Sequence, residues 1–316
     1  MQACLAEQAL LFPPRSLFAT PTPPREAETL VFASFLFLFA TFLIIVGLRR
    51  KEREDGMTPP LVELRNVSVV RGENLALDRV SLRIEQGEHL CILGPNGCGK
   101  STLIKTLTRE CYPIAREDSS IQILGKERWN IFELRSLLGI VSPDLLAACT
   151  TDATGLDVVI SGFFSSTRVF PNHQPEPEHR ERAEAALAKL GIAHLAKRPV
   201  VEMSSGEAKR TLIARAVVHD PQTLLFDEPS NALDIAGQVE LRETMRELAR
   251  EGLGILLVTH HVSEIIPEIE RVVLLQGGRI LADGAKQSVL TDERLSELFC
   301  VPVRLFREDG YFYLHA

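Results

Sequence analysis

The chain has 316 residues, of which 45% are hydrophobic and 24% charged, a composition typical of one large globular domain or two small ones. Its net charge of −7 predicts no direct nucleic-acid partner, because such partners favour a basic face. The six cysteines lack a CxxC pair and regular spacing, which argues against a disulfide framework or a zinc site and favours a reducing compartment.

The first 56 residues differ from the rest of the chain. Residues 1–29 contain a proline-rich stretch and are predicted to be irregular. Residues 30–48 carry no charge, and as a helix they would span about 28 Å, close to the hydrocarbon thickness of a bilayer. Basic residues 49–51 follow, so the carboxyl side of such a single transmembrane helix is expected in the cytoplasm.

A second interpretation of this segment stays open. Met57 directly precedes the first predicted strand and is a candidate initiator, in which case residues 1–56 are a translated extension without a role. A natural product that starts at Met57 would exclude the membrane anchor.

Short apolar strands follow, predicted at residues 61–66, 67–70 and 76–84, and then at 89–93. The last of these strands leads into a phosphate-binding loop, which has a glycine, four residues and then Gly-Lys-Ser. The residues of this pattern are Gly94, Pro95, Asn96, Gly97, Cys98, Gly99, Lys100, Ser101 and Thr102.

This loop predicts a nucleoside triphosphate site. Glycines let successive N–H groups turn toward phosphate oxygens, and the helix that begins near Ser101 adds its positive end. Lys100 would reach the β- and γ-phosphates, and the Ser101 hydroxyl would ligate Mg²⁺. A plain glycine turn between a strand and a helix is the structural alternative.

A mainly helical insert is predicted from about residue 142 to residue 205, after strands at 121–124 and 138–141. It contains predicted helices at 157–164 and 179–190. The apolar face of the second helix consists of Ala183, Ala186, Leu187 and Leu190.

Two further apolar strands end in polar residues. The strand at 223–228 ends in Asp227-Glu228, and the strand at 255–260 ends in His260. Alternating strands and helices predict a parallel sheet, which binds ligands beyond the carboxyl ends of its strands. We therefore expect these three side chains at the same edge of the sheet as the phosphate-binding loop.

Residues 61–290 resemble the ATP-binding cassette of ABC-type ATPases. The motifs that carry the resemblance are the Walker A loop Gly94–Thr102, the signature-like Met203–Glu207, the Walker B end Asp227-Glu228, the D-loop Ser230–Asp234 and the switch histidine His260. The resemblance implies an α/β fold. Its P-loop NTPase (RecA-like) core would have a mainly parallel sheet, an N-terminal antiparallel β part and an inserted α-helical subdomain.

The resemblance also implies that water attacks the γ-phosphate of ATP in line. Asp227 would hold Mg²⁺ opposite Ser101. Glu228 would act as the general base and His260 would contact the γ-phosphate; the alternative for Glu228 is a cap on the following turn. A metal pair of His260 and His261 is disfavoured, because adjacent side chains of a regular strand point to opposite faces.

By the same resemblance, the ATP site is completed by a second cassette. Ser204, Ser205 and Gly206 would contact ATP held by another chain, and Asp234 belongs to the predicted nucleotide-contacting set. With one cassette per chain, two sites require two chains, so a homodimer is expected.

The chain departs from the family at two places. Arg71 stands where an aromatic residue normally stacks on adenine, and a guanidinium plane can also stack on a base. Pro143 or Asp144 stands where the Q-loop glutamine is expected, which puts the coupling to a transmembrane partner in question. The segments Val141–Asp144, Ser204–Glu207 and Thr259–His261 make the chain similar to the molybdenum-transport and photorepair branch.

Residues 291–316 carry no predicted chemistry. They follow a predicted hairpin at 272–282 and are expected to form a helix at 291–299, with Thr291 as its N-cap, and strands at 301–305 and 311–314.

The sequence thus predicts a Mg²⁺-dependent ATPase subunit that powers a separate membrane permease from the cytoplasmic face of the membrane. The alternative is a soluble cassette whose ATP-driven dimerisation acts as a switch, as in repair or translation. The missing glutamine favours the switch, whereas a genuine membrane span favours the transporter. A third interpretation, a nucleotide-binding module without turnover, predicts that Glu228→Gln leaves ATPase activity unchanged.

Overall fold

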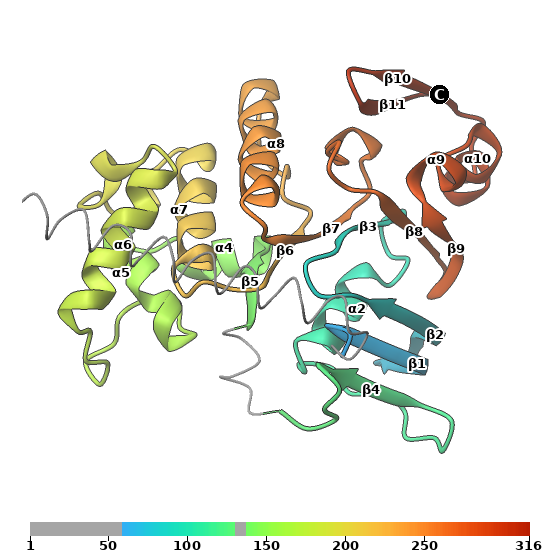
Figure 1. Ribbon diagram of the computed structural model, residues 1–316, viewed down its shortest axis with the longest axis horizontal. Helices are drawn as coiled ribbons and strands as arrows, with labels where there is room; N and C mark the ends of the chain where they lie inside the picture. Colours follow the sequence, from blue (N-terminus) through green and yellow to red (C-terminus); the bar gives the residue numbers. More distant parts are fainter. Residues whose placement is uncertain (1–58, 130–136) are drawn as a thin grey trace, which may run out of the picture. The chain divides into compact units, whose positions relative to one another are not determined.

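A computed structural model describes residues 59–129 and 137–316 (Figure 1). Residues Pro59–Ala316 form one compact unit. The irregular segment predicted at 1–29 and the transmembrane helix predicted at 30–48 lie outside the described residues. Within the described ranges, no helix is both long and apolar enough to cross a membrane.

The antiparallel amino-terminal part is a three-stranded sheet in the order β2-β1-β4. Its strands are β1 (Val62–Arg71), β2 (Asn74–Ile84) and β4 (Ser120–Ile123). β1 is one continuous strand, so the predicted division into two strands is wrong. The pairing of β1 with β2 shifts register within the strand, and the backbone of Asn66 is left-handed, with φ of 46°. These local irregularities do not end the strand.

The central sheet has six strands in the order β5-β6-β7-β3-β8-β9. These strands are β5 (Leu138–Val141), β6 (Thr223–Asp227), β7 (Gly254–Thr259), β3 (His89–Leu93), β8 (Arg271–Gln276) and β9 (Arg279–Ala285). Neighbouring strands from β5 to β8 are parallel and only β9 is antiparallel. Every residue of β7 is buried, because a parallel sheet is covered on both faces. The predicted fold class is confirmed.

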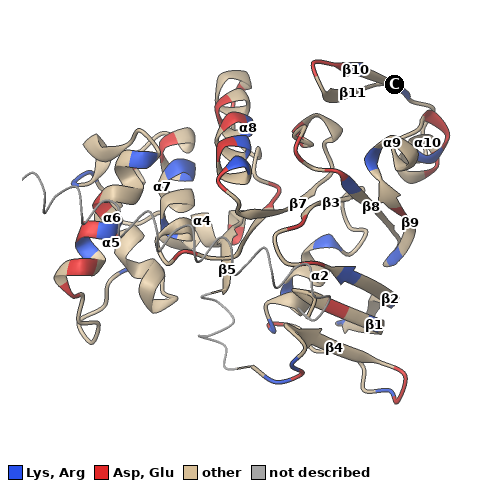
Figure 2. Ribbon diagram, viewed as in Figure 1, with Lys and Arg blue, Asp and Glu red and all other residues tan. Residues whose placement is uncertain are grey.

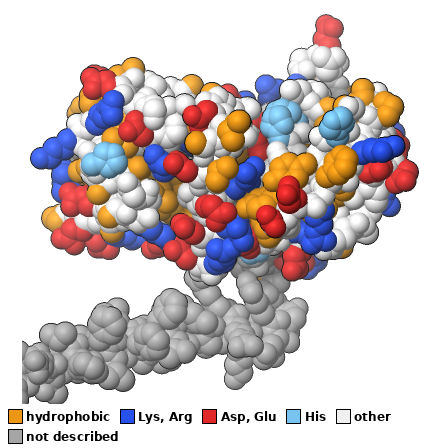
Figure 3. Space-filling model, turned by 90° about the horizontal axis from the view of Figure 1, so that it is seen from above, with side chains coloured by type: hydrophobic (Ala, Val, Ile, Leu, Met, Phe, Trp, Pro, Cys, Tyr) orange, Lys and Arg blue, Asp and Glu red, His pale blue; other side chains and the backbone are white. Residues whose placement is uncertain are grey.

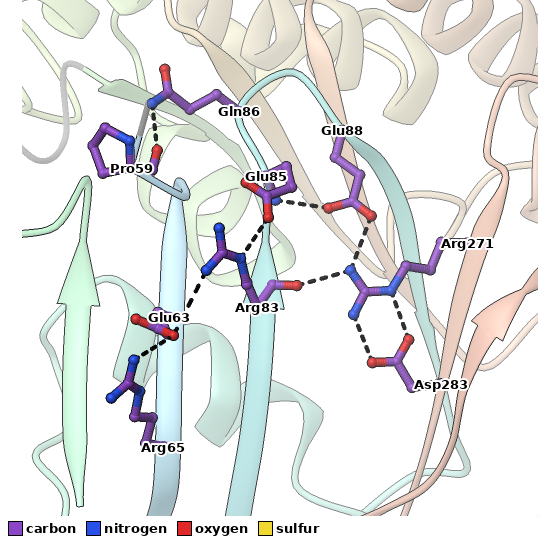
Figure 4. Close-up of polar contacts among 9 residues, drawn as sticks. All are labelled: Pro59, Glu63, Arg65, Arg83, Glu85, Gln86, Glu88, Arg271 and Asp283. Atoms are coloured by element: carbon purple, nitrogen blue, oxygen red, sulfur yellow. Dashed lines mark hydrogen bonds and ion pairs between the residues drawn. The ribbon is translucent and has the colours of Figure 1, made fainter. Parts of the chain in front are cut away.

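Arg271 ties the two sheets together (Figure 4). Its Nη1 donates to the backbone carbonyl of Arg83 in β2 at 2.8 Å and contacts Glu88, just before β3, at 3.0 Å. Its Nε and Nη2 donate to both oxygens of Asp283 in β9 at 2.7 and 2.6 Å. The planar guanidinium suits this bidentate pairing, so one side chain fixes β2 and β9 around the strand that leads into the phosphate-binding loop.

The insert at 142–205 contains three α-helices, namely α4 (Pro143–Cys149), α5 (Gly155–Ile160) and α6 (Pro177–Lys189), and α7 (Ser205–Val217) begins where it ends. Figure 1 shows α5, α6 and α7 grouped apart from strands β1, β2 and β4. These three helices share a buried apolar cluster that includes Leu156, Ile160, Ala183, Leu187 and Ala214. Charged side chains line the outside of α6 (Figure 2), which agrees with the predicted amphipathic pattern.

Two helical predictions need correction. The predicted helix at 157–164 is α5 followed by a 3₁₀ turn at Ser161–Phe164. Helix α8 (Ile235–Arg250) was not predicted, although Leu241, Met245 and Leu248 form a buried stripe at helical spacing.

The carboxyl-terminal part contains the predicted hairpin, helix and last two strands, together with one short helix that was not predicted. The hairpin of β8 and β9 forms around Gly277-Gly278 and is followed by α9 (Lys286–Val289) and α10 (Asp292–Phe299). Thr291 caps α10 by accepting a hydrogen bond from the Arg294 amide. The last two strands are β10 (Arg304–Glu308) and β11 (Tyr311–His315), so the first begins later than predicted.

Candidate active site

The phosphate-binding loop joins β3 to α2 (Lys100–Leu107) and depends on glycines at both ends. A Cβ added to Gly94 would lie 2.3 Å from the Leu275 carbonyl oxygen. Gly99 has φ of +109°, and a Cβ there would lie 2.5 Å from the Ala76 carbonyl oxygen. Only glycine satisfies both the left-handed backbone and the close approach, so the loop is held against β2 and β8.

Cys98 fills the inside of this loop. Its side chain is buried, and burial raises the pKa of the thiol. It therefore serves as a small apolar residue. Among the described residues, Cys91, Cys98, Cys111, Cys149 and Cys300 are free thiols.

The order of the central strands brings the catalytic candidates together. β7 lies between β3 and β6 in the sheet. Backbone carbonyls at the carboxyl end of β7 accept hydrogen bonds from the first residue after β3 and from the first residue after β6. The Gly94 amide donates to the Thr259 carbonyl at 3.2 Å, and the Glu228 amide donates to the Val258 carbonyl at 2.8 Å. His260 follows directly on β7, so it emerges between the phosphate-binding loop and Glu228.

Glu228 contacts both of the other catalytic candidates. Its Oε1 lies 3.1 Å from Lys100 Nζ, and its Oε2 lies 2.5 Å from His260 Nδ1. Lys100 Nζ also donates to the carbonyls of Gly94 at 2.7 Å and Pro95 at 3.1 Å. The side chains of Lys100, Glu228 and His260 are 6%, 13% and 25% exposed. A largely desolvated ammonium and carboxylate therefore face each other at the edge where phosphate is expected.

The backbone of Glu228 is left-handed, with φ of 44°. A non-glycine residue held there costs about 1–3 kcal/mol and persists only where its surroundings impose it. The surroundings here are the amide bond to Val258 and the following turn, in which the Asn231 amide donates to the Glu228 carbonyl at 3.2 Å. This backbone turn aims the carboxylate back toward the loop, which a simple extension of β6 would not do.

Asp227 offers an unsatisfied buried carboxylate. Its Oδ1 is buried without a hydrogen-bond partner among the described residues. Burial first, and the nearby charge of Glu228 second, raise its pKa to about 6. Asp227 lines the same cavity as Ser101. A hydroxyl and an orphaned carboxylate at one cavity wall fit a hard divalent cation such as Mg²⁺.

The signature-like segment forms a complete capping box at the start of α7. The Ser204 hydroxyl accepts from the Glu207 amide at 3.3 Å, and Glu207 Oε2 accepts from the Ser204 amide at 2.8 Å. The bond from the Ser204 amide is the main reason that the pKa of Glu207 is lowered. Glu207, which replaces the glutamine of the family, therefore points to its own helix end. Ser205 and Gly206 are the first helical residues and are partly or fully exposed.

The structure does not bring this segment to the catalytic candidates of its own chain. No hydrogen bond or ion pair within the described ranges links Ser204, Ser205 or Gly206 to Lys100, Glu228 or His260. Asp234 caps α8, because its Oδ1 accepts from the Gly237 amide at 2.8 Å. Arg71 is exposed at the end of β1, where its Nη1 contacts Cys111 Sγ at 3.3 Å.

At the position of the missing glutamine the structure has a capped helix start. The Ser142 hydroxyl accepts from the Leu145 amide at 3.2 Å, and Pro143 begins α4. The Asp144 carboxylate, 81% exposed, lies 3.1 Å from Lys105 Nζ in α2. Lys105 was not predicted as a site residue, although it lies one turn after Ser101 on the same helix.

A cavity of about 320 Å³ opens beside this ion pair. It runs from Ser101 and Asp227 to residues of the insert, and its lining also includes Leu145, Gly162 and His219. Both ring nitrogens of His219 are buried without a hydrogen-bond partner in the described part of the chain. Burial is the main reason that the pKa of His219 is lowered to about 4. The nucleotide edge is thus continuous with a pocket between the α/β core and the helical insert.

His260 and His261 lie beyond the end of β7, whereas the prediction placed His260 on a regular strand. β7 ends at Thr259, so the strand alternation does not extend to the next two residues. The rings of His260 and His261 approach to 3.8 Å between centroids, with a tilt of 41°. Among the described residues, however, no group of three or more His, Cys, Asp or Glu side chains is placed to hold a metal ion.

The fold and this site together define a P-loop nucleoside triphosphatase with an inserted helical part. A family model described as ABC transporter matches residues 77–231. An uncharacterised ABC transporter ATP-binding protein of Bacillus subtilis, YlmA, is 32% identical over 262 residues, covering 81% of this chain and 97% of the relative. The chain belongs to the ATP-binding subunits of ABC transporters, which hydrolyse ATP, and it is an ATPase cassette that energises a transporter.

Two other relatives are named for import. The cobalt import ATP-binding protein CbiO of Rhodobacter capsulatus is 36% identical, covering 75% of this chain and 82% of the relative. The hemin import ATP-binding protein HmuV of Bradyrhizobium diazoefficiens is 30% identical, covering 80% and 94%. A metal-chelate type ABC transporter in an inward-facing conformation superposes with a TM-score of 0.65 at 26% identity, covering 81% of this chain and 96% of the other. The expected molybdenum-transport and photorepair branch is not supported by these relatives.

Proposed function

We propose that this cassette binds Mg²⁺-ATP at a composite site shared by two copies of the chain and drives a separate permease. The observation that carries the proposal is the contact of Glu228 with both Lys100 and His260. These side chains come from three different parts of the sequence and share one sheet edge.

Binding of ATP would exchange the partners of Lys100. In the structure its ammonium is held by the Gly94 and Pro95 carbonyls and by Glu228. Phosphate oxygens are stronger partners for an ammonium than neutral carbonyls, so the β- and γ-phosphates would take Lys100. The amides of the loop and the start of α2 would hold the remaining phosphate oxygens, and Arg71 would stack on the base.

Glu228 would then be free to accept a proton from water. Its left-handed backbone directs the carboxylate toward the loop, and His260 is close enough to orient it and to contact the γ-phosphate. Ser101 and Asp227 would hold Mg²⁺, which neutralises phosphate charge when it is bound.

The second copy would supply its signature segment. Ser204, Ser205 and Gly206 lie at the start of α7, where the exposed amides and the helix dipole favour a phosphate. Glu207 Oε2 already accepts from the Ser204 amide at this helix end, so its negative charge would oppose the partner's phosphate there. Asp234, the last residue of the D-loop, holds the start of α8 and would act on the site through that loop.

The permease partner is inferred from the relatives and from the cavity beside Lys105 and Asp144. Relatives named for cobalt and hemin import, and a neighbour of metal-chelate type, favour import of a metal-containing cargo. Cargo selection would then lie in other subunits. On the face drawn in Figure 3, acidic and basic side chains are interspersed without a large basic area, which favours a protein partner over nucleic acid.

We place the cassette, residues 61–290 with its insert at 142–205, as a peripheral subunit on the cytoplasmic face of the membrane. The carboxyl-terminal residues 291–316 would serve packing. The second candidate function is that of a soluble cassette whose ATP-driven dimerisation acts as a switch. The observation that favours it is the absence of a glutamine at residues 142–144.

Two measurements test the proposal. Glu228→Gln should lower kcat by at least about 100-fold and preserve ATP binding, because the charge that accepts the proton is removed while the shape is kept. Unchanged hydrolysis would refute the assigned base. Affinity purification of the full chain from membranes should recover a multi-span permease, and recovery of soluble complexes alone would favour the switch.

A further inference from the structure

A polar concavity of about 670 Å³ lies outside the candidate active site and has no role in the reaction above. Its volume falls within the range of small-molecule sites, about 300–1,000 Å³. Arginines dominate its lining, which consists of Asp78, Arg79, Ser81, Arg116, Arg279 and Ile280. These residues come from β2, from β9 and from the connection between α2 and β4. Three arginines and one aspartate give the concavity a net charge of +2, in a chain whose net charge is −7.

Two of these arginines are available to a ligand. The side chains of Arg79 and Arg116 are exposed, and neither makes a hydrogen bond or ion pair within residues 59–129 and 137–316. A guanidinium has five N–H donors and no acceptor, so only acceptors from water or from a ligand can satisfy these groups. Phosphate oxygens match its planar fork and are stronger partners than neutral oxygens.

Arg279 is only partly committed to the protein. Its Nε donates to Asp78 Oδ2 at 2.8 Å, and its Nη2 donates to the same oxygen. Its Nη1 makes no hydrogen bond to the described residues, and 74% of the side chain is exposed. One edge of this guanidinium therefore holds Asp78 while another edge remains open to an anion.

The backbone of Arg79 is left-handed, with φ of 51°. Its amide donates at 3.0 Å to the hydroxyl of Ser68, a residue of β1 that is only 1% exposed. A non-glycine residue persists in this region only where its surroundings impose it, and such positions cluster at ligand sites. A buried hydroxyl thus fixes the position from which Arg79 reaches the concavity.

Two backbone hydrogen bonds connect the concavity to the phosphate-binding loop. The Asp78 amide donates to the Gly278 carbonyl at 2.9 Å, and the Gly278 amide donates to the Cys98 carbonyl at 2.9 Å. Gly278 directly precedes Arg279 in the chain. Because the Asp78–Arg279 pair flanks both bonds, an anion that draws Arg279 away from Asp78 acts on residues that hold the loop.

We propose that this concavity binds a phosphate group through Arg79, Arg116 and Arg279, and that the bound anion weakens ATP binding by competing with Asp78 for Arg279. The ligand is a free phosphate ion or a small phosphate ester, since both present the same oxygens. The effect on ATP rests on the nucleotide site of the proposed function, whereas binding of the anion does not. Coupling of this kind is reciprocal, so ATP would weaken anion binding by the same factor.

Calorimetric titration tests the binding. The Glu228→Gln chain is saturated with Mg²⁺-ATP, so that the phosphate-binding loop is filled, and is titrated separately with inorganic phosphate and with glycerol 3-phosphate. Tighter binding of one probe identifies the free ion or the ester as the ligand. Arg79→Ala/Arg116→Ala in the same chain should bind the better probe at least about tenfold more weakly, because charge-assisted bonds are lost. Equal binding by the two chains, or no binding by either, would overturn the proposal.

A charge-matched control separates local contacts from the overall charge. Arg180→Ala/Arg304→Ala removes two exposed arginines from α6 and β10 and should bind both probes normally. A loss as large as that of Arg79→Ala/Arg116→Ala would mean that net charge alone attracts the anion, against the proposal. ATP binding by both double variants confirms that they are folded.

The coupling is measured as the Kd for ATP with and without saturating phosphate. Phosphate also competes for the loop itself, and the Arg79→Ala/Arg116→Ala chain reports that contribution alone. In the Glu228→Gln chain with its arginines intact, phosphate should weaken ATP binding about fivefold more than in this variant. Equal weakening in the two chains would overturn the coupling.

The two proposals fail in different ways. If the Glu228→Gln chain does not bind ATP, the proposed nucleotide site itself is wrong, and the anion site is still measured as the difference in phosphate binding between this chain and its arginine variant. If ATP binds normally and the arginine substitutions leave phosphate binding unchanged, only the anion site is overturned.

Discussion

Glu228 and Lys100 form an ion pair of 3.1 Å that joins the end of β6 to the phosphate-binding loop. The candidate base and the candidate phosphate-binding cation therefore neutralise each other in the structure. We expect ATP to break this pair, so that loading of the loop and release of the base are one event. This order would prevent Glu228 from acting before a phosphate is present.

The first prediction concerns Lys100. Lys100→Met should weaken ATP binding by at least about 100-fold, because it removes a charge-assisted bond to phosphate oxygens from a desolvated site. Calorimetric titration of the variant with Mg²⁺-ATP measures the change. Lys197→Met, at an exposed position of the insert, is the control and should bind normally. Equal affinities for the two variants would remove Lys100 from the site.

The second prediction concerns the backbone of the loop. Gly99→Ala should lower the free energy of unfolding by about 2–4 kcal/mol, since it adds a steric clash with the Ala76 carbonyl to an unfavourable φ. Gly252→Ala has a similar φ of +97° but no atom within 4 Å of the added Cβ, and should cost only about 1 kcal/mol. Urea unfolding compares the two. Similar losses would mean that the close approach does not matter.

The third prediction concerns the capping box. Glu207→Ala should lower the free energy of unfolding by about 1 kcal/mol, because the Ser204 amide loses its acceptor. Glu207→Gln keeps an acceptor and should cost less than half of that. A larger loss for Gln than for Ala, measured by urea unfolding, would contradict the assigned role.

The fourth prediction concerns pH. The pKa of His219 is lowered to about 4 in the fold, so the unfolded chain binds the proton more readily. The contribution of His219 to stability is therefore present above pH 6.5 and is lost as pH falls toward 4, by up to about 3 kcal/mol. His219→Asn should flatten this part of the stability curve, whereas His315→Asn, at the exposed carboxyl end, should not. Urea unfolding across this range checks the difference, and parallel curves for the two variants would refute the assignment.

Local patterns predicted most of the elements. The phosphate-binding loop, the strand that ends in Asp227-Glu228 and the Thr291 cap were recognisable because each depends on neighbouring residues. Helix α8 was missed although its apolar stripe was present, and β1 was divided although it is one strand whose pairing with β2 shifts register at three places.

The sequence by itself determined the class of protein, since phosphate binding needs glycines, a lysine and a hydroxyl at a fixed local spacing. It could not determine that Glu228 turns back through a left-handed backbone to meet Lys100, or that His260 and His261 lie ring against ring. Those relationships depend on the strand order β6-β7-β3. Contacts between residues far apart in the chain are decided only when the sheet and its helices assemble.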